Sequence, residues 1–434
     1  MHGPLMKRQK TLDSQPVLRS SRIFYGYWMV AFAFLCLTVC IGCGSFSFSL
    51  FVKPLQASLG WNRAEIMVGF TTFWVMMGVG SPLVGRLLDR QGARKVIPMG
   101  AAVMGLGFVV LSMAHDLYLF YLGYVLIGTG AAGIGPVPAS AIVSNWFKKK
   151  RGFAIGLMSA GIGAGGVVMA PVANYLLESY GWRTAYFAIA VIVWVAIIPL
   201  SWLVVRTRPS EMGLNPDNEQ SAVGENDVEA KAESIALQGL SLRQSVTTAA
   251  FWLIGVSYFL GNFSSMGGLQ GQVPNLNDIG FPTDTAAAAL GAIGLGSGVG
   301  KVVFGWLCDR MEPKLASAIG LSLQCAALFI LLQLRSDSPV ALIWAYALLM
   351  GFGAGSWLPT MSMLVSKNFG LKYYGAVFGA VNFAQSVGTA IGPLVAGMMY
   401  DSMGTYYWAF VLFTVLYGIS IPAVLLVRRP KPSD

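Results

Sequence analysis

One lysine lies inside a long stretch of mostly apolar and small residues. Lys301 precedes Asp309 by eight residues in the segment 284–307. At 1.5 Å per residue, it lies about 12 Å from the helix end, near the middle of a hydrocarbon core of about 30 Å. An ammonium group there attracts a carboxylate strongly, because its surroundings screen charge less than water does. The alternative is that Lys301 snorkels toward the nearer membrane face, although its side chain of roughly 6 Å falls short.

No aspartate, glutamate or histidine lies in the middle of a predicted span. Aspartates and glutamates occupy loops, tails or span ends, and His2 and His115 lie in a tail and a loop. This placement argues against a metal site, an intramembrane protease and a buried carboxylate proton relay. No set of catalytic side chains remains, so we predict a protein that is not an enzyme and uses no cofactor.

Composition places these residues in a membrane protein. The 434 residues are 55% hydrophobic and 11% charged, with a mean hydropathy of +0.64, whereas soluble chains have about 25% charged residues. At about 20 apolar residues per span, the chain holds roughly a dozen spans. We predict an all-α integral membrane protein with twelve transmembrane helices, near residues 24–51, 66–87, 96–114, 117–144, 153–178, 184–205, 249–274, 284–307, 315–334, 339–366, 374–400 and 405–427.

The spans divide into two groups of six. The N-terminal half covers residues 24–205 and the C-terminal half residues 249–427, with tails at 1–23 and 428–434. The connecting segment 206–248 is polar and acidic, so we expect a flexible linker that buries too little apolar surface to fold.

Lysine and arginine placement predicts the orientation. If both termini are cytoplasmic, 24 of the 29 basic residues lie on that side; Lys53, Arg63, Arg183 and Arg335 lie outside and Lys301 lies within a span. Basic residues accumulate on the cytoplasmic side of membrane proteins. We therefore predict a multi-pass protein of the plasma (cell inner) membrane, surrounded by lipids. The net charge of +10 then needs no nucleic-acid partner.

The two halves repeat each other in sequence. Residues 85–90 (GRLLDR) match residues 305–310 (GWLCDR) at an offset of 220, and residues 147–156 match 369–379 at an offset near 223. A parallel repeat of two six-span halves places a substrate cavity between them near the membrane midplane. It also lets one half rock against the other.

Several motifs resemble those of the major facilitator superfamily. The stretch GRLLDRQGARK (85–95) is similar to its signature loop after the second span. More specifically, FVKPLQASLGWNRAEI (51–66), WFKKKRGFAIG (146–156), RTRPSEMGLNPD (206–217) and YYGAVFG (373–379) resemble the oxalate/formate antiporter and monocarboxylate transporter branch. This resemblance implies secondary transport of small organic anions, often together with a proton.

The resemblance also implies a role for Lys301. In that branch a substrate-binding arginine precedes the glycine of the eighth-span loop by four residues, and here Lys301 precedes Gly305. Lysine keeps the charge but lacks the bidentate geometry of arginine. Ser297 stands where monocarboxylate transporters commonly carry an aspartate, and 374–400 lacks the second basic residue of oxalate antiporters. A single positive charge favours a monoanion. Without the family's usual pair, the alternatives are proton coupling through Lys301 or the substrate itself, uncoupled transport, and anion exchange.

Other polar and aromatic residues are weaker candidates to line the cavity. Tyr124 stands where many facilitators carry a fourth-span arginine, and a phenol donates well to a carboxylate. Polar residues recur on one face of the seventh and eleventh spans, although each could equally serve as a contact between helices. The predicted substrate-binding set is Lys301, Tyr124, Tyr258, Asn262, Gln270, Phe46, Trp357, Asn382 and Gln385.

Charged residues at the cytoplasmic ends of the second and eighth spans are candidates for gating. We predict ion pairs between the halves that hold the outward-facing state and break on inward opening. The alternative is that they signal topology and stabilise helix ends. The residues are Asp89, Arg90, Arg94, Asp309 and Arg310.

The sequence thus predicts a monomeric carrier that moves a small monocarboxylate by alternating access, by proton symport or by anion exchange. One alternative is an exporter of a neutral or amphipathic compound, in which Lys301 serves only the gate. The other is a non-transporting membrane sensor or scaffold, which would require a sizeable folded cytoplasmic domain that the spans leave no room for.

Overall fold

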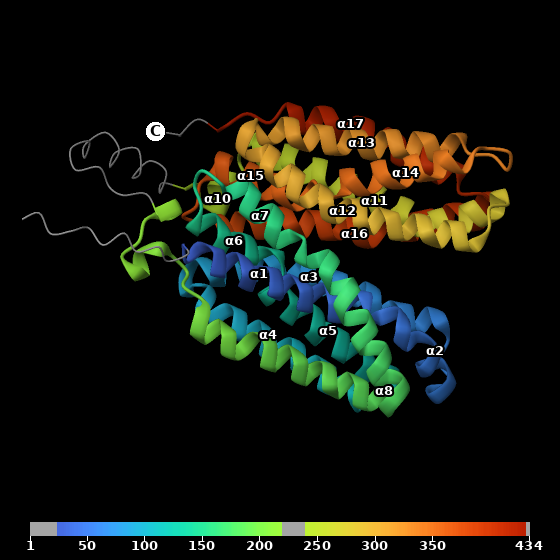
Figure 1. The fold of residues 1–434 in the computed structure, drawn as a ribbon, viewed down its shortest axis with the longest axis horizontal. Helices are drawn as coiled ribbons and strands as arrows, with labels where there is room; N and C mark the ends of the chain where they lie inside the picture. Colours follow the sequence, from blue (N-terminus) through green and yellow to red (C-terminus); the bar gives the residue numbers. More distant parts are fainter. Residues whose placement is uncertain (1–23, 219–238, 431–434) are drawn as a thin grey trace, which may run out of the picture.

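The computed structural model describes residues 24–218 and 239–430, and within them the chain is built from helices (Figure 1). Of the predicted tails and linker, residues 1–23, 219–238 and 431–434 lie outside the described residues. The first half contains α1 (Gly26–Ile41), a π-helical turn (Gly42–Phe46), α2 (Phe48–Leu59), α3 (Arg63–Gln91), α4 (Ala93–Ser112), α5 (Leu117–Ile134), α6 (Pro136–Trp146), α7 (Arg151–Ser159) and α8 (Gly161–Val204). After the short α10 (Leu242–Ser245), the second half contains α11 (Ala249–Ile279), α12 (Thr283–Arg310), α13 (Pro313–Gln333), α14 (Val340–Ala354), α15 (Trp357–Phe369), α16 (Tyr374–Met403) and α17 (Tyr407–Leu425).

Nine stretches of the described chain are long and apolar enough to cross a membrane. One of them, Arg151–Val204, holds two spans, because Gly181 at φ 78° breaks its helical backbone. Glycine adopts this left-handed conformation without a steric penalty. The more polar helices α11 and α16, with 31 and 30 residues, bring the spans to twelve. The predicted all-α fold with two six-span halves is confirmed.

Some spans consist of two helices joined end to end. In the fourth span, α5 ends at Ile134, Gly135 is extended, and α6 restarts at Pro136. Proline suits this first helical position because it has no N–H group to leave unpaired. In the first span, the π-helical turn joins α1 to α2, so one continuous apolar stretch runs from Gly26 to Leu59. Such breaks are tolerated at membrane depth where protein or a cavity surrounds them.

The bundle has two distinct ends. We call the end that carries residues 206–218 the linker end, and the opposite end, with its turns at Gly60, Gly181, Gly280 and Gly404, the far end. The linker end lies at the left of Figure 1, and the ribbons of the two halves diverge toward the far end at the right.

At the linker end, backbones of the two halves touch at glycines. A Cβ atom on Gly85 of α3 would overlap the carbonyl oxygen of Gly375 on α16, and one on Gly152 of α7 would overlap the carbonyl oxygen of Gly305 on α12. The same holds for Gly156 against the carbonyl oxygen of Lys301. Small residues allow helices in membranes to approach this closely. These contacts close the linker end.

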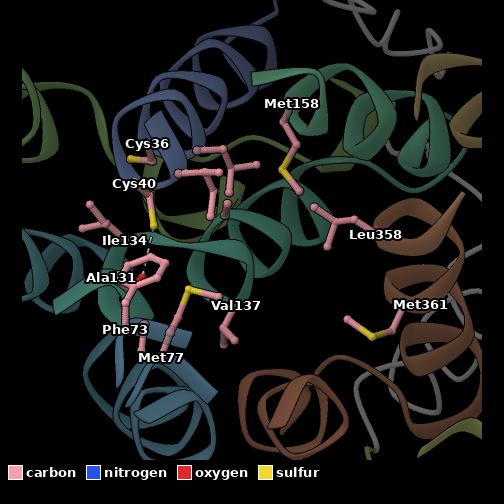
Figure 2. Close-up of a cluster of buried hydrophobic side chains, with 14 of the residues drawn as sticks. Cys36, Cys40, Phe73, Met77, Ala131, Ile134, Val137, Met158, Leu358 and Met361 are labelled. Atoms are coloured by element: carbon pink, nitrogen blue, oxygen red, sulfur yellow. Dashed lines mark hydrogen bonds between the residues drawn. The ribbon is translucent and has the colours of Figure 1, made fainter. Parts of the chain in front are cut away.

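Apolar side chains fill the space between the halves near that end. Figure 2 shows Met77, Val137 and Met158 of the first half pointing toward Leu358 and Met361 of the second. All five are at most 2% exposed. We call this group the methionine floor. Because all five side chains are buried, the group separates the linker end from the far end of the bundle.

The segment 206–218 differs from the predicted flexible linker. The indole of Trp146 donates to the carbonyl of Arg206 at 2.8 Å, and the hydroxyl of Thr207 accepts from the backbone N–H of Ala93 at 3.1 Å. One carboxylate oxygen of Asp217 accepts from the backbone N–H groups of residues 148 and 149. Polar composition predicted a segment without a core, but these hydrogen bonds attach it to the first half instead.

Candidate functional site

Lys301 lies on α12 with 3% of its surface exposed. Its ammonium donates to the hydroxyl of Ser297 at 2.5 Å and approaches the carbonyl oxygen of Ser297 at 3.4 Å. Ser297 lies one turn nearer the N-terminus of α12, which is the far end, and helical side chains lean in this direction. The side chain therefore points away from the linker end. This is the opposite of the snorkelling toward the nearer face that the sequence left open.

The ammonium of Lys301 has no charged neighbour among the described residues. Its hydrogen bonds go to a residue of its own helix, so no side chain from another span neutralises it. An unpaired charge buried at this depth is costly, and a bound anion offsets that cost. Ser297, noted in the sequence only because it is not an aspartate, is the residue that orients the ammonium.

An open face of α12 leads from the far end to Lys301. Gly291, Gly294 and Gly298 follow each other by three or four residues, which places them on one face together with Lys301. No atom lies within 4 Å of where a Cβ would stand on any of the three. Gly163 of the fifth span is open in the same way, although Gly156, seven residues before it, packs against Lys301. The fifth and eighth spans therefore touch at the linker end and separate toward the far end.

Polar residues of α11 and α16 meet inside the second half. The amide nitrogen of Gln385 donates to the amide oxygen of Asn262 at 3.1 Å and to the hydroxyl of Thr389 at 3.1 Å. Asn262 is half-buried and Gln385 is buried. Asn382 instead crosses between the halves, because its amide donates to the hydroxyl of Ser81 at 2.9 Å.

The two candidate tyrosines lie in the cores of their own halves. The hydroxyl of Tyr258 hydrogen-bonds to those of Thr360 at 2.6 Å and Ser317 at 3.2 Å. Tyr124 is 2% exposed, and its hydroxyl lies 3.5 Å from that of Tyr186. In this conformation neither hydroxyl is turned toward the opposite half.

The remaining candidates lie at more accessible positions. Phe46, at the end of the π-helical turn, is 43% exposed and lies against Gly166 of the fifth span. Trp357 begins α15 and is half-buried, and Gln270 is exposed on α11. These three are not joined to Lys301 by any hydrogen bond among the residues the structure describes.

Lys53 is a second basic residue within a span, which the sequence analysis placed in an outer loop. Here α2 continues to Leu59, so Lys53 lies inside the apolar stretch Gly26–Leu59. The signal was present in the sequence, because the buried residues Phe48, Val52 and Leu55 keep helical spacing past Lys53. Phe46 and the exposed Lys53 are seven residues apart and share a face of this span.

The gating candidates fall into two groups. Asp309 accepts hydrogen bonds from the backbone N–H groups of Gly152 and Phe153 at 2.7 and 2.8 Å, and Asp89 makes the equivalent contacts to the start of α16. These links between the halves are carboxylate-to-backbone hydrogen bonds, whereas the sequence predicted ion pairs. Sequence spacing does not show which backbone groups a helix start leaves unpaired.

The arginines of that prediction stay within their own half. The guanidinium of Arg94 donates to the carbonyl of Trp202 at 3.0 Å, and that of Arg310 stacks on the ring of Trp306 at 4.3 Å. Arg90 is exposed at the linker end of α3. In this conformation none of the three forms an ion pair with the other half among the described residues.

Two repeated six-span halves that close at one end and diverge at the other are the architecture of a membrane transporter. A sequence model described as Major Facilitator Superfamily matches residues 34–388 and 258–434. The chain belongs to this superfamily, and it is a transporter rather than an enzyme.

Individual relatives and solved structures are similar over most of the chain. Monocarboxylate transporter 13 of Rattus norvegicus is 27% identical over 84% of this chain and 80% of its own length. Monocarboxylate transporter 11 of Homo sapiens is 26% identical over 76% of this chain and 68% of its own. The crystal structure of the human organic anion transporter MFSD10 (TETRAN) matches with a TM-score of 0.70 at 16% identity, covering 92% of this chain and 99% of that one.

Proposed function

We propose that this transporter carries a small monocarboxylate and that Lys301 binds the carboxylate. The observation that carries the proposal is the buried ammonium without a charged neighbour at the end of the open face of α12. Relatives named monocarboxylate transporters, at 24–27% identity, agree with this substrate class.

In this mechanism the anion enters from the far end along Gly291, Gly294 and Gly298. Its carboxylate replaces or joins Ser297 as the partner of Lys301, because a charge-assisted hydrogen bond is stronger than one to a neutral hydroxyl. One ammonium neutralises one carboxylate, so a dianion would carry uncompensated charge into a dry site. The neutralised pair then allows the halves to close at the far end and part at the linker end.

We propose that transport of the anion is coupled either to a proton moving in the same direction or to an anion moving in the opposite direction. In exchange, Lys301 is paired with an anion during each closure, which avoids moving an unpaired ammonium through the occluded state. In symport, a proton accompanies the anion and the empty carrier must return alone. We further propose that the protein lies in the plasma membrane with both termini cytoplasmic, that it works as a monomer, and that residues 24–205 and 249–427 move as the two halves.

Uptake by the purified protein in liposomes tests the proposal. A panel of labelled monocarboxylates of two to four carbons is compared with a dicarboxylate and a neutral amide, with and without a pH gradient. We expect saturable uptake of a monocarboxylate that Lys301→Ala abolishes and Lys301→Arg partly retains. Lys314→Ala, at a lysine in the first turn of α13 that pairs with Glu312 at 3.1 Å, is the matched control. Uptake that survives Lys301→Ala would refute the role of Lys301, and uptake of only the neutral amide would favour the exporter.

A pH gradient and an internal anion separate the two coupling modes. Symport is driven by a gradient of protons across an otherwise empty liposome. Exchange requires unlabelled monocarboxylate inside the liposome and is insensitive to the pH gradient.

A further inference from the structure

A cavity of about 490 Å³ lies at the linker end, apart from Lys301 and the methionine floor. Its wall from the first half includes Arg90, Asn145 and Arg208, and its wall from the second half includes Leu371, Lys372 and Tyr374. The volume lies within the range of sites for small molecules. The cavity lies between the segment after the sixth span and the start of α16.

The two carboxylates in the cavity wall are already engaged. Asp89 accepts from the backbone N–H groups of Gly375 and Ala376 at 2.9 and 2.8 Å. Glu211 accepts from the backbone N–H groups of Thr207 and Arg208 at 3.3 and 3.1 Å. Backbone N–H groups therefore occupy acceptor positions of both carboxylates, and the basic groups remain to bind a ligand.

Three cations around the cavity lack a hydrogen-bonding partner for their head groups within the described part of the chain. Arg208 is close enough to attract Asp89, and the ammonium of Lys372 lies 5.5 Å from the ring of Tyr373. Arg90 is exposed beside them. Arginine and lysine together form the chemistry that recognises a phosphate group, as a planar fork and a point charge.

The cations come from both halves. Arg90 and Arg208 belong to the first half and its trailing segment, whereas Lys372 precedes α16 in the second. Gly85 of α3 packs directly on Gly375, next to the cavity, so parting of the linker end moves Lys372 away from the arginines. An anion held by both sets binds the closed linker end more tightly than the open one, and it shifts the population accordingly.

We propose that this cavity binds a phosphate-bearing anion, which holds the linker end closed and so slows the transport cycle. The chemistry is shared by free phosphorylated compounds and by lipid headgroups. Pyrophosphate serves as the probe for the first source, and phosphatidylglycerol serves for the second.

Calorimetric titration of the full chain in nanodiscs of neutral phosphatidylcholine tests binding independently of any transported substrate. We expect saturable binding of pyrophosphate, with a Kd about tenfold weaker in the double variant Arg208→Gln/Lys372→Gln, which corresponds to the loss of about one charged hydrogen bond. Lys314→Gln, at the linker end but outside the cavity, keeps the wild-type Kd.

A second variant tests the link to closure. Gly85→Val retains every cation but forces α3 away from Gly375, so pyrophosphate binding should weaken although the net charge is unchanged. Wild-type affinity in this variant would overturn the link to closure. Size-exclusion profiles and thermal unfolding confirm that each variant is folded.

Two further outcomes decide whether the bound phosphate group belongs to a lipid and whether the cavity binds a phosphate group at all. The site is assigned to a lipid headgroup if phosphatidylglycerol nanodiscs raise the unfolding temperature of the wild type but not of the double variant, and if pyrophosphate does not bind. The proposal would be overturned if pyrophosphate does not bind and phosphatidylglycerol does not stabilise the protein, or if pyrophosphate binds the double variant with the same Kd as the wild type.

Discussion

Asp89 and Asp309 occupy equivalent places in the two halves, and each binds the first turn of a helix in the opposite half. Asp89 of α3 accepts from two N–H groups at the start of α16, and Asp309 of α12 accepts from two at the start of α7. A helix start leaves N–H groups unpaired and carries partial positive charge, so a carboxylate satisfies both. The linker end is thus closed by two equivalent contacts, each between a carboxylate and the N-terminus of a helix.

Replacing either carboxylate should loosen this closure. In Asp309→Asn the charge is lost, and we expect the closed linker end to be destabilised by about 1–2 kcal/mol. Hydrogen exchange measured by mass spectrometry should then speed up in the peptide that contains Gly152 and Phe153. Asp116→Asn is the control, because Asp116 caps α5 within one half at 2.7 Å. Equal protection in Asp309→Asn and wild type would contradict the assignment.

A side chain at the glycine contact should part α7 from α12. In Gly152→Val the added carbons overlap the carbonyl oxygen of Gly305 and crowd Cys308. Cys308 is buried in the present structure, so its rate of alkylation reports the opening, and we expect at least a tenfold rise. Gly397→Val, where a Cβ meets open space, should leave the rate unchanged.

The open face of α12 predicts a different result for its glycines. In Gly294→Val the new Cβ has no atom within 4 Å in this conformation, and valine costs less backbone entropy in a helix than glycine does. We expect stability to be kept and uptake to fall more than tenfold, because the side chain blocks the approach to Lys301 and the closing of the far end. Gly418→Val in α17 should keep both stability and uptake. Normal uptake by Gly294→Val would mean that the substrate takes another path.

We expect Lys301 to destabilise the folded protein although transport requires it. Lys301→Met keeps most of the volume and removes a buried charge, so we expect the free energy of unfolding to rise by about 1–4 kcal/mol. Thermal unfolding followed by tryptophan fluorescence measures this change, and uptake by the same variant should be lost. Ser297→Ala removes the hydrogen-bond partner but keeps the charge, and it should weaken stability. A drop in stability on Lys301→Met would show that the ammonium is satisfied in the protein alone.

The fold could be predicted from the sequence because a bilayer allows few solutions. Apolar length fixes the spans, and the repeated GRLLDR and GWLCDR motifs pair the halves. The position of Lys301 within a span could be read from the sequence, whereas the direction of its side chain could not, because that depends on Ser297. The extent of the first span was missed because Lys53-Pro54 reads as a loop start, whereas the structure places Pro54 inside α2.

Contacts between segments far apart in the sequence could not be predicted from the sequence. Asn382 hydrogen-bonds to Ser81 across the halves, and Tyr258 hydrogen-bonds to Thr360 within one half. In the sequence, Asn382 and Tyr258 are both simply polar positions on a helix. Which neighbour each one faces is decided by how the helices pack. The fold of residues 206–218 was likewise hidden, because hydrogen bonds to other segments, rather than apolar burial, hold it.

The methionine floor has a consequence for the speed of the carrier. Met77, Met158 and Met361 are unbranched and flexible side chains that fill irregular gaps. When the halves rock, such side chains change rotamer and follow the moving surface, so the barrier stays low without a transient void. We infer that the floor closes the linker side of the pathway and still follows the two halves as they move.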